Sequence, residues 1–182
     1  MRSPLVDASS FPELVEHNST IATAVLIVYH NLESSGDVSP ASGGFSAMLR
    51  MLVRGRNALL HSMEVVNRVF MSSSPPALPT EFLDAYIIAI VENTAAINDA
   101  SMRHRFVRLI CIFLNSIIRH AALCTNGGLT GSDDDAPAAA ALATAFGEGE
   151  TAAEVLSVIA AFCIEHSRVK EAADLFKSFA SL

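Results

Sequence analysis

The sequence predicts an all-α fold, in which about seven or eight helices form an irregular bundle around a central amphipathic helix at about 100–121. Apolar residues recur at helical spacing through almost the whole chain. Clusters of Gly, Pro, Ser and Asn separate these stretches, and no stretch alternates apolar and polar residues as a strand would. Because 182 residues suit one domain, we expect residues 1–182 to form a single helical protein-interaction domain.

Three of the first four predicted helices begin at residues that favour a helix start. Pro12 is tolerated in the first turn of the first helix, Asn18 can cap the second, and Asn57 can cap the fourth. In the fourth helix Glu64 precedes Arg68 by four residues, which is the favourable order for an exposed ion pair. The predicted boundaries are about 11–17, 19–33, 45–54 and 58–71, with a loop at 33–44.

Four further helices follow the proline-rich break at 72–79. Asn98 or Asp99 can cap the central helix, Ser167 can cap the last helix, and Lys170 is expected to pair with Asp174 on the outer side of that helix. The Gly, Asp and Ala content of 125–150 is typical of a mobile insertion, although its Ala run could form a frayed helix. The predicted boundaries are about 80–96, 100–121, 151–165 and 168–180.

Charge and cysteine content exclude some classes of protein. The net charge of −7 argues against a strongly basic nucleic-acid binder, but residues 43–121 hold eight Arg against five Asp or Glu. Cys111, Cys124 and Cys163 form no CxxC motif, so buried free thiols in a reducing compartment are expected. No secretory signal is visible, and no uninterrupted apolar run reaches the ~18 residues that a membrane helix needs.

The central helix separates into two sides at about 100° per residue. Its polar side, here called the arginine stripe, covers an arc of about 120°. The stripe contains His104, Arg105, Arg108, Asn115, Ser116 and Arg119, and only Ile112 interrupts it. The apolar side contains Phe106, Val107, Leu109, Ile110, Phe113, Leu114, Ile117 and Ile118. An apolar arc this wide needs neighbours on two or three sides, and the arginines argue against a membrane span.

Three interpretations of the arginine stripe remain open. Its arginines can pair with acids on neighbouring helices, for which Glu64, Glu92 and Glu165 are candidates. The stripe can instead anchor an acidic or helical peptide of a partner protein. In the third and weaker interpretation it binds RNA phosphates, against which the acidic net charge and the lack of interleaved surface aromatics argue.

No motif predicts catalysis. The six histidines form no HExxH pattern, the serines form no GxSxG elbow, and the glycines form no phosphate-binding loop. His61 and Glu64 could share a helix face, but no further ligand accompanies them as a zinc site would require. We therefore expect no enzyme, no metal site and no cofactor.

Several unusual stretches resemble a known family. They are FPELVEHN at 11–18, LLHSMEVVNRVF at 59–70, LPTEF at 78–82, MRHRFVRLICIFLNSIIR at 102–119 and IAAFCIEHSRVKEAADLFKSF at 159–179. In this order they resemble the C-terminal helical domain of the eleventh subunit of the CCR-NOT deadenylase complex. The insertion at 125–150 is longer than in that family and indicates a divergent lineage.

The resemblance implies a non-catalytic adaptor in mRNA poly(A)-tail shortening and decay, located in the cytoplasm and also in the nucleus. In the family, an N-terminal part that this chain lacks contacts the tenth subunit and the scaffold subunit, while this domain recruits partner proteins. An excised domain of a longer protein is one interpretation of the chain. Direct RNA binding through the arginine stripe is the alternative function.

The resemblance also supplies the candidate partner-binding residues, which are the polar positions that match the family. They are His61, Glu64, Asn67, Arg68, Arg105, Arg108, Ser116, Arg119, Glu165 and Arg168. Ser167 and Glu171 match as well.

Overall fold

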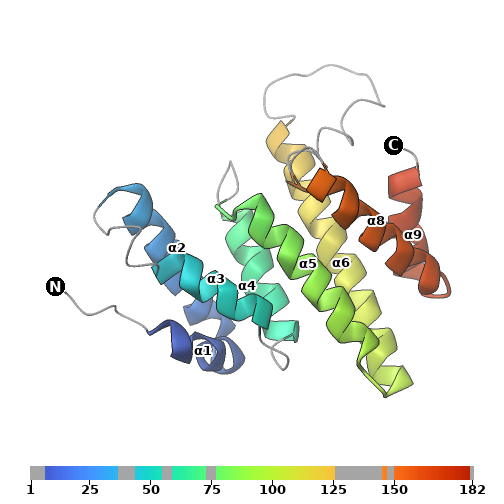
Figure 1. Ribbon diagram of the computed structural model, residues 1–182, viewed down its shortest axis with the longest axis horizontal. Helices are drawn as coiled ribbons and strands as arrows, with labels where there is room; N and C mark the ends of the chain where they lie inside the picture. Colours follow the sequence, from blue (N-terminus) through green and yellow to red (C-terminus); the bar gives the residue numbers. More distant parts are fainter. Residues whose placement is uncertain are drawn as a thin grey trace. The chain divides into compact units, whose positions relative to one another are not determined.

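The computed structural model describes residues 7–36, 44–54, 59–72, 77–125, 145–146 and 150–180 (Figure 1). Every regular element within these ranges is a helix, and none is a strand, so the all-α prediction is confirmed. The chain divides into two compact units, unit 1 at Met1–Leu78 and unit 2 at Pro79–Leu182, each of which has its own packing. The single-domain organisation stays a prediction.

Unit 1 contains the short 3-10 helix η1 (Ala8–Ser10) and four α-helices. They are α1 (Phe11–His17), α2 (Ser19–Ser34), α3 (Gly44–Arg54) and α4 (Leu59–Met71). Helix α2 packs against α1, α3 and α4, and α1 also contacts α3 and α4. The apolar sides of these helices meet in a buried core that includes Phe11, Val15, Leu26, Met48, Val66 and Phe70.

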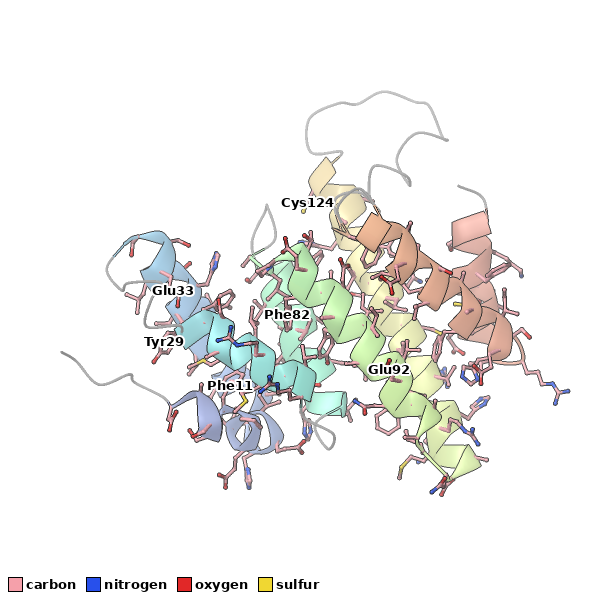
Figure 2. The ribbon with its side chains drawn as sticks, in the orientation of Figure 1. Phe11, Tyr29, Glu33, Phe82, Glu92 and Cys124 are labelled. Atoms are coloured by element: carbon pink, nitrogen blue, oxygen red, sulfur yellow. The ribbon has the colours of Figure 1, made fainter. Side chains whose placement is uncertain are left out.

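Side-chain caps fix the starts of α2 and α3 in unit 1. The Asn18 side chain accepts a hydrogen bond from the Ile21 backbone N–H at 3.0 Å, as predicted. At the start of α3, the Phe45 N–H donates to the Glu33 carboxylate of α2 at 3.0 Å, and the glycine at 44 lets the backbone approach the Tyr29 ring (Figure 2). A Cβ at Gly44 would lie 2.6 Å from that ring, so the close approach requires glycine. The predicted cap Asn57 lies outside the described residues.

Unit 2 contains α5 (Thr80–Ala95), α6 (Ala100–Thr125), α8 (Glu150–Glu165) and α9 (Lys170–Ala180). Helix α6 contacts α5 and α9, while α8 contacts α5 and α9, so the four helices enclose one core (Figure 1). Tyr86 of α5 meets Phe113 of α6 edge to face at 6.0 Å. Asp99 is the residue that caps α6, because its carboxylate accepts from the Ser101 and Met102 N–H groups at 2.8 and 3.0 Å.

Three details of unit 2 differ from the prediction. Helix α6 runs on to Thr125. The last helix begins at Lys170, because residues 166–169 form a turn closed by the Val169 N–H on the His166 carbonyl, so the residue before the helix is not Ser167. Asp174 pairs with Lys177 at 3.8 Å and not with Lys170.

The predicted insertion at 125–150 lies mostly outside the described residues. Ala145 and Phe146 are described, and both are buried. The mobility of the insertion stays a prediction.

Helix α6 is the one described helix that is long and apolar enough to cross a membrane by length and composition. A buried core helix passes the same test. Helix α6 packs against α5 and α9, and four arginines lie along it.

Candidate protein-interaction surfaces

The two sides of α6 differ in exposure as the sequence predicts. Val107, Ile110, Phe113, Leu114 and Ile117 are buried on the apolar side, while Phe106, Leu109 and Ile118 are half-buried. On the arginine stripe, His104, Arg105, Arg108 and Arg119 are exposed, and Asn115 and Ser116 are half-buried. Ile112, which interrupts the stripe, is 50% exposed. The helix therefore supports the core with one side and presents the other to its surroundings.

Arg108 is the arginine of the stripe that has an acidic partner. Its Nε lies 2.6 Å from Oε1 of Glu171, in the first turn of α9. The pKa of the Glu171 carboxyl is lowered, first by a hydrogen bond to its own backbone N–H and then by Arg108. Internal pairing thus accounts for Arg108, whose partner is Glu171 and not the expected Glu92 or Glu165 of the same unit, while Glu64 of unit 1 pairs with Arg68.

Arg105 and Arg119 differ from Arg108. Neither forms an ion pair with any acid in the described ranges. Helix α6 itself contains no Asp or Glu, whereas the chain as a whole carries −7. The outer side of α6 is thus a cationic surface on an acidic protein.

The candidates on α4 form a second group, here called the α4 polar cluster. Arg68 Nη2 lies 2.6 Å from Glu64 Oε1, which confirms the predicted pair, and Arg68 Nη1 donates to the Thr20 hydroxyl at 3.0 Å. His61 Nδ1 lies 3.5 Å from Glu16 Oε2. The cluster is therefore His61, Glu64 and Arg68 with Glu16 and Thr20, and it connects α4 to α1 and α2.

Asn67 does not belong to this cluster. Its side-chain oxygen is buried and accepts no hydrogen bond within the described part of the chain. Asn67 is half-buried and lies at the margin of the buried side of α4, and its role as a partner-binding residue stays a prediction.

The remaining candidates lie where α8 ends. Glu165, Ser167 and Arg168 are exposed there, beside Ile164, which is 59% exposed. His166, which directly follows α8, packs edge to face on Phe162 of that helix at 4.8 Å, so this ring has a packing role.

Cys111 is a buried thiol of unit 2 with little reactivity. Cys111 and Cys163 are free and buried, as predicted, and the pKa of Cys111 is raised by a hydrogen bond with Cys163 and by burial. Such a thiol is a poor nucleophile. Cys124 is half-buried, and its Sγ lies 3.6 Å from His120 Nε2. No group of three or more His, Cys, Asp or Glu that could hold a metal ion occurs among the residues described.

Asp84 is a buried acid on α5 that sequence patterns did not single out. It is 5% exposed, and its Oδ1 accepts no hydrogen bond from the described residues. Burial, and to a smaller degree the charge of Glu81, raise its pKa to about 6.

Comparison with known proteins identifies the family of the chain. The family model of CCR4-NOT transcription complex subunit 11 matches residues 15–129, well over half of the chain. The chain belongs to this family. CCR4-NOT transcription complex subunit 11 of Dictyostelium discoideum is 28% identical over 169 residues, which are 93% of this chain but 20% of that relative. The chain thus spans about a fifth of the length of the curated relative it matches.

The match to the subunit 11 family confirms the resemblance that the sequence showed. Its range includes α2 to α6 and therefore both the α4 polar cluster and the arginine stripe. Glu165 and Arg168 lie beyond the end of the matched range, although the Dictyostelium relative aligns over most of the chain.

Proposed function

We propose that this chain is a non-catalytic adaptor module of the CCR4-NOT complex, which recruits partner proteins during mRNA poly(A)-tail shortening and decay in the cytoplasm and the nucleus. Membership of the subunit 11 family is the observation that carries this proposal. The helical architecture supports it, because packed helices that present exposed polar and aliphatic side chains suit protein recognition.

The contacts with the tenth subunit and the scaffold subunit are expected to lie outside this chain, which corresponds to about a fifth of the Dictyostelium relative.

Affinity purification with cross-linking tests the proposal. The tagged chain, expressed in cells, is expected to recover CCR4-NOT subunits or specific further proteins, because an adaptor holds its partners through exposed side chains. Reversal of charge at Arg105 and Arg108 should remove some of these proteins. Reversal at Arg50, an exposed arginine of α3 in unit 1, is the matched control. Recovery of nothing above background by the unchanged chain would contradict the adaptor role.

Direct binding of poly(A) RNA is the second candidate function. Arg105 and Arg119 favour it, since they form no ion pair with a described acid and could contact phosphates. Against it, the exposed positions of the stripe carry no Phe or Tyr on which bases could stack. Binding to an oligo(A) probe that weakens steeply with added salt would support this function, and no binding at low salt would remove it.

A further inference from the structure

We propose that the arginine stripe of α6 is the docking site for one acidic, amphipathic helix of a partner protein. This inference rests on the proposed adaptor function and specifies its site and the chemistry of its partner. It concerns only unit 2.

The spacing of the exposed side chains on α6 favours a helical partner. Arg105, Ile112 and Arg119 follow one another at intervals of seven residues, and Arg108 and Asn115 each lie three residues after a member of this series. A repeat of seven with a second position three residues on is the pattern along which two α-helices pack at a shallow angle. Arg105 and Arg119 are separated by about 21 Å along the axis, since each residue adds ~1.5 Å.

The charges along this seam determine the chemistry of the partner. Helix α6 carries four Arg and no Asp or Glu, and Arg105 and Arg119 form no ion pair with the acids described. A second copy of α6 would bring arginine against arginine and repel. A partner helix with Asp or Glu about four turns apart would place a carboxylate at each of these two arginines.

The exposed side chain of Ile112 determines which type of residue is expected at the middle of the partner helix. Its side chain is 50% exposed between the two arginines, so an aliphatic residue of the partner can cover it and exclude water from the flanking ion pairs. A nucleic acid would gain little from an exposed aliphatic side chain, because bases stack on aromatic rings. The partner helix is therefore acidic at both ends and aliphatic at its centre.

Arg108 gives this site an internal competitor. Its guanidinium is paired with Glu171, whose side chain is 26% exposed. A carboxylate of the partner must share Arg108 with Glu171. Glu171→Gln should therefore strengthen binding by about twofold to fivefold, because an exposed ion pair is worth only a few tenths to about 1 kcal/mol.

Selection from a displayed peptide library on the 182-residue chain tests the proposal. The enriched peptides should carry Asp or Glu about four turns apart with an aliphatic residue between them, and their binding should weaken with salt. The double variant Arg105→Glu/Arg119→Glu should bind them at least about tenfold more weakly, because like charges then face each other. Arg50→Glu is the matched charge control on an exposed residue of unit 1.

Two further variants test whether weaker binding is specific to the stripe or follows the loss of any exposed apolar side chain. Ile112→Ser should weaken binding, while Ile164→Ser, at a similarly exposed isoleucine of α8, should not. A selected peptide whose two acids are changed to Lys should regain binding to the double variant, an effect that a purely structural role of these arginines would not produce. The proposal is overturned if no acidic peptide is enriched, or if the enriched peptides bind the double variant as well as the unchanged chain. It is also overturned if peptides do not bind while oligo(A) binds the chain and loses this binding in the double variant.

The two proposals can fail separately. If affinity purification recovers specific proteins whose recovery is unchanged by Arg105→Glu/Arg119→Glu, the adaptor function stands and this docking site is wrong. If the peptides bind as expected but purification from cells recovers nothing, the docking site stands and the adaptor function is wrong.

Discussion

Arginines on α4 and on α6 lie at positions that match the subunit 11 family, but the surroundings of these arginines differ. On α4, Arg68 is held by Glu64 of its own helix and by the Thr20 hydroxyl of α2. On α6, Arg105 and Arg119 form no ion pair with the acids that the structure describes, and Arg108 is held by Glu171 of α9. Matching polar positions therefore fall into two kinds, those that join helices of their own unit and those that are available to a partner.

This difference has a physical basis in the position of each helix. Helix α4 contacts α1 and α2, and its polar residues lie at the margin of that packing, where Glu16 and Thr20 are within reach. The arginine stripe lies opposite the buried side of α6, and among its arginines only Arg108 reaches a described acid of a neighbouring helix. Substitutions of buried residues should therefore lower the free energy of unfolding by several kcal/mol, and substitutions of exposed residues should lower it by tenths of a kcal/mol.

The largest effect is expected on the buried side of α6. Leu114 is fully buried, so Leu114→Ala removes apolar contacts and leaves a cavity, which should cost about 2–5 kcal/mol of the free energy of unfolding. Arg119→Ala, on the exposed side of the same helix, should change it by less than about 0.5 kcal/mol. Urea unfolding followed by circular dichroism measures both. Similar losses for the two variants would contradict the assignment of the two sides.

A second, smaller effect concerns the buried carboxyl of Asp84 in unit 2. The pKa of Asp84 is raised from 3.8 to about 6, so the folded state holds its proton more tightly than the unfolded state does. Stability from this group is therefore fully present below about pH 4 and is lost as the pH rises through about 6. Asp84→Asn removes that loss and should raise the free energy of unfolding at pH 7.5 by about 1–3 kcal/mol.

The gain from Asp84→Asn should vanish near pH 4, where the carboxyl of the unchanged protein is already protonated. Glu92→Gln, at an exposed acid of the same helix, is the matched control for loss of a carboxylate and should change the free energy of unfolding by less than about 0.5 kcal/mol (Figure 2). Urea unfolding at several pH values measures both variants. An equal gain at pH 4 and 7.5 would show that the buried charge is not the cause.

The helices and most of their starts could be predicted from the sequence, because the signals lie within a few residues of one another. Asn18 and Asp99 cap the helices that directly follow them, and the pair Glu64–Arg68 lies within one helix. The side of α6 that is buried also follows from residues within α6 alone.

The sequence could not predict contacts between distant segments. Glu33 caps a helix that begins eleven residues later, and Glu171 reaches Arg108 from another helix, so both depend on how the helices pack. Asn67 lies on the margin between the buried and exposed sides of α4, where a helical wheel does not distinguish the two. Because Glu171 lies on another helix, the sequence could not show that Arg108 has an acidic partner while Arg105 and Arg119 pair with no described acid.

A third prediction compares the two arginine environments directly. Arg68→Ala removes the ion pair with Glu64 and the hydrogen bond to Thr20, which join α4 to α2. It should cost about 0.5–1.5 kcal/mol of the free energy of unfolding. Arg105→Ala should cost less than about 0.5 kcal/mol, since no described acid pairs with it. Equal costs in urea unfolding would remove the distinction between the two helices.

The smallest effect is expected for the ion pair between Arg108 of the arginine stripe and Glu171 of α9. The Arg108 side chain is 61% exposed and that of Glu171 26% exposed, so water and salt screen the pair. A double-mutant cycle with Arg108→Ala and Glu171→Ala should give a coupling free energy of about 0.2–1 kcal/mol. That coupling should fall when salt is added. A coupling well above this range, unchanged by salt, would mean that Arg108 serves the architecture of unit 2 as Arg68 serves that of unit 1. The binding surface on α6 would then consist only of Arg105, Ile112 and Arg119, and Glu171→Gln would no longer be expected to strengthen binding of an acidic helix.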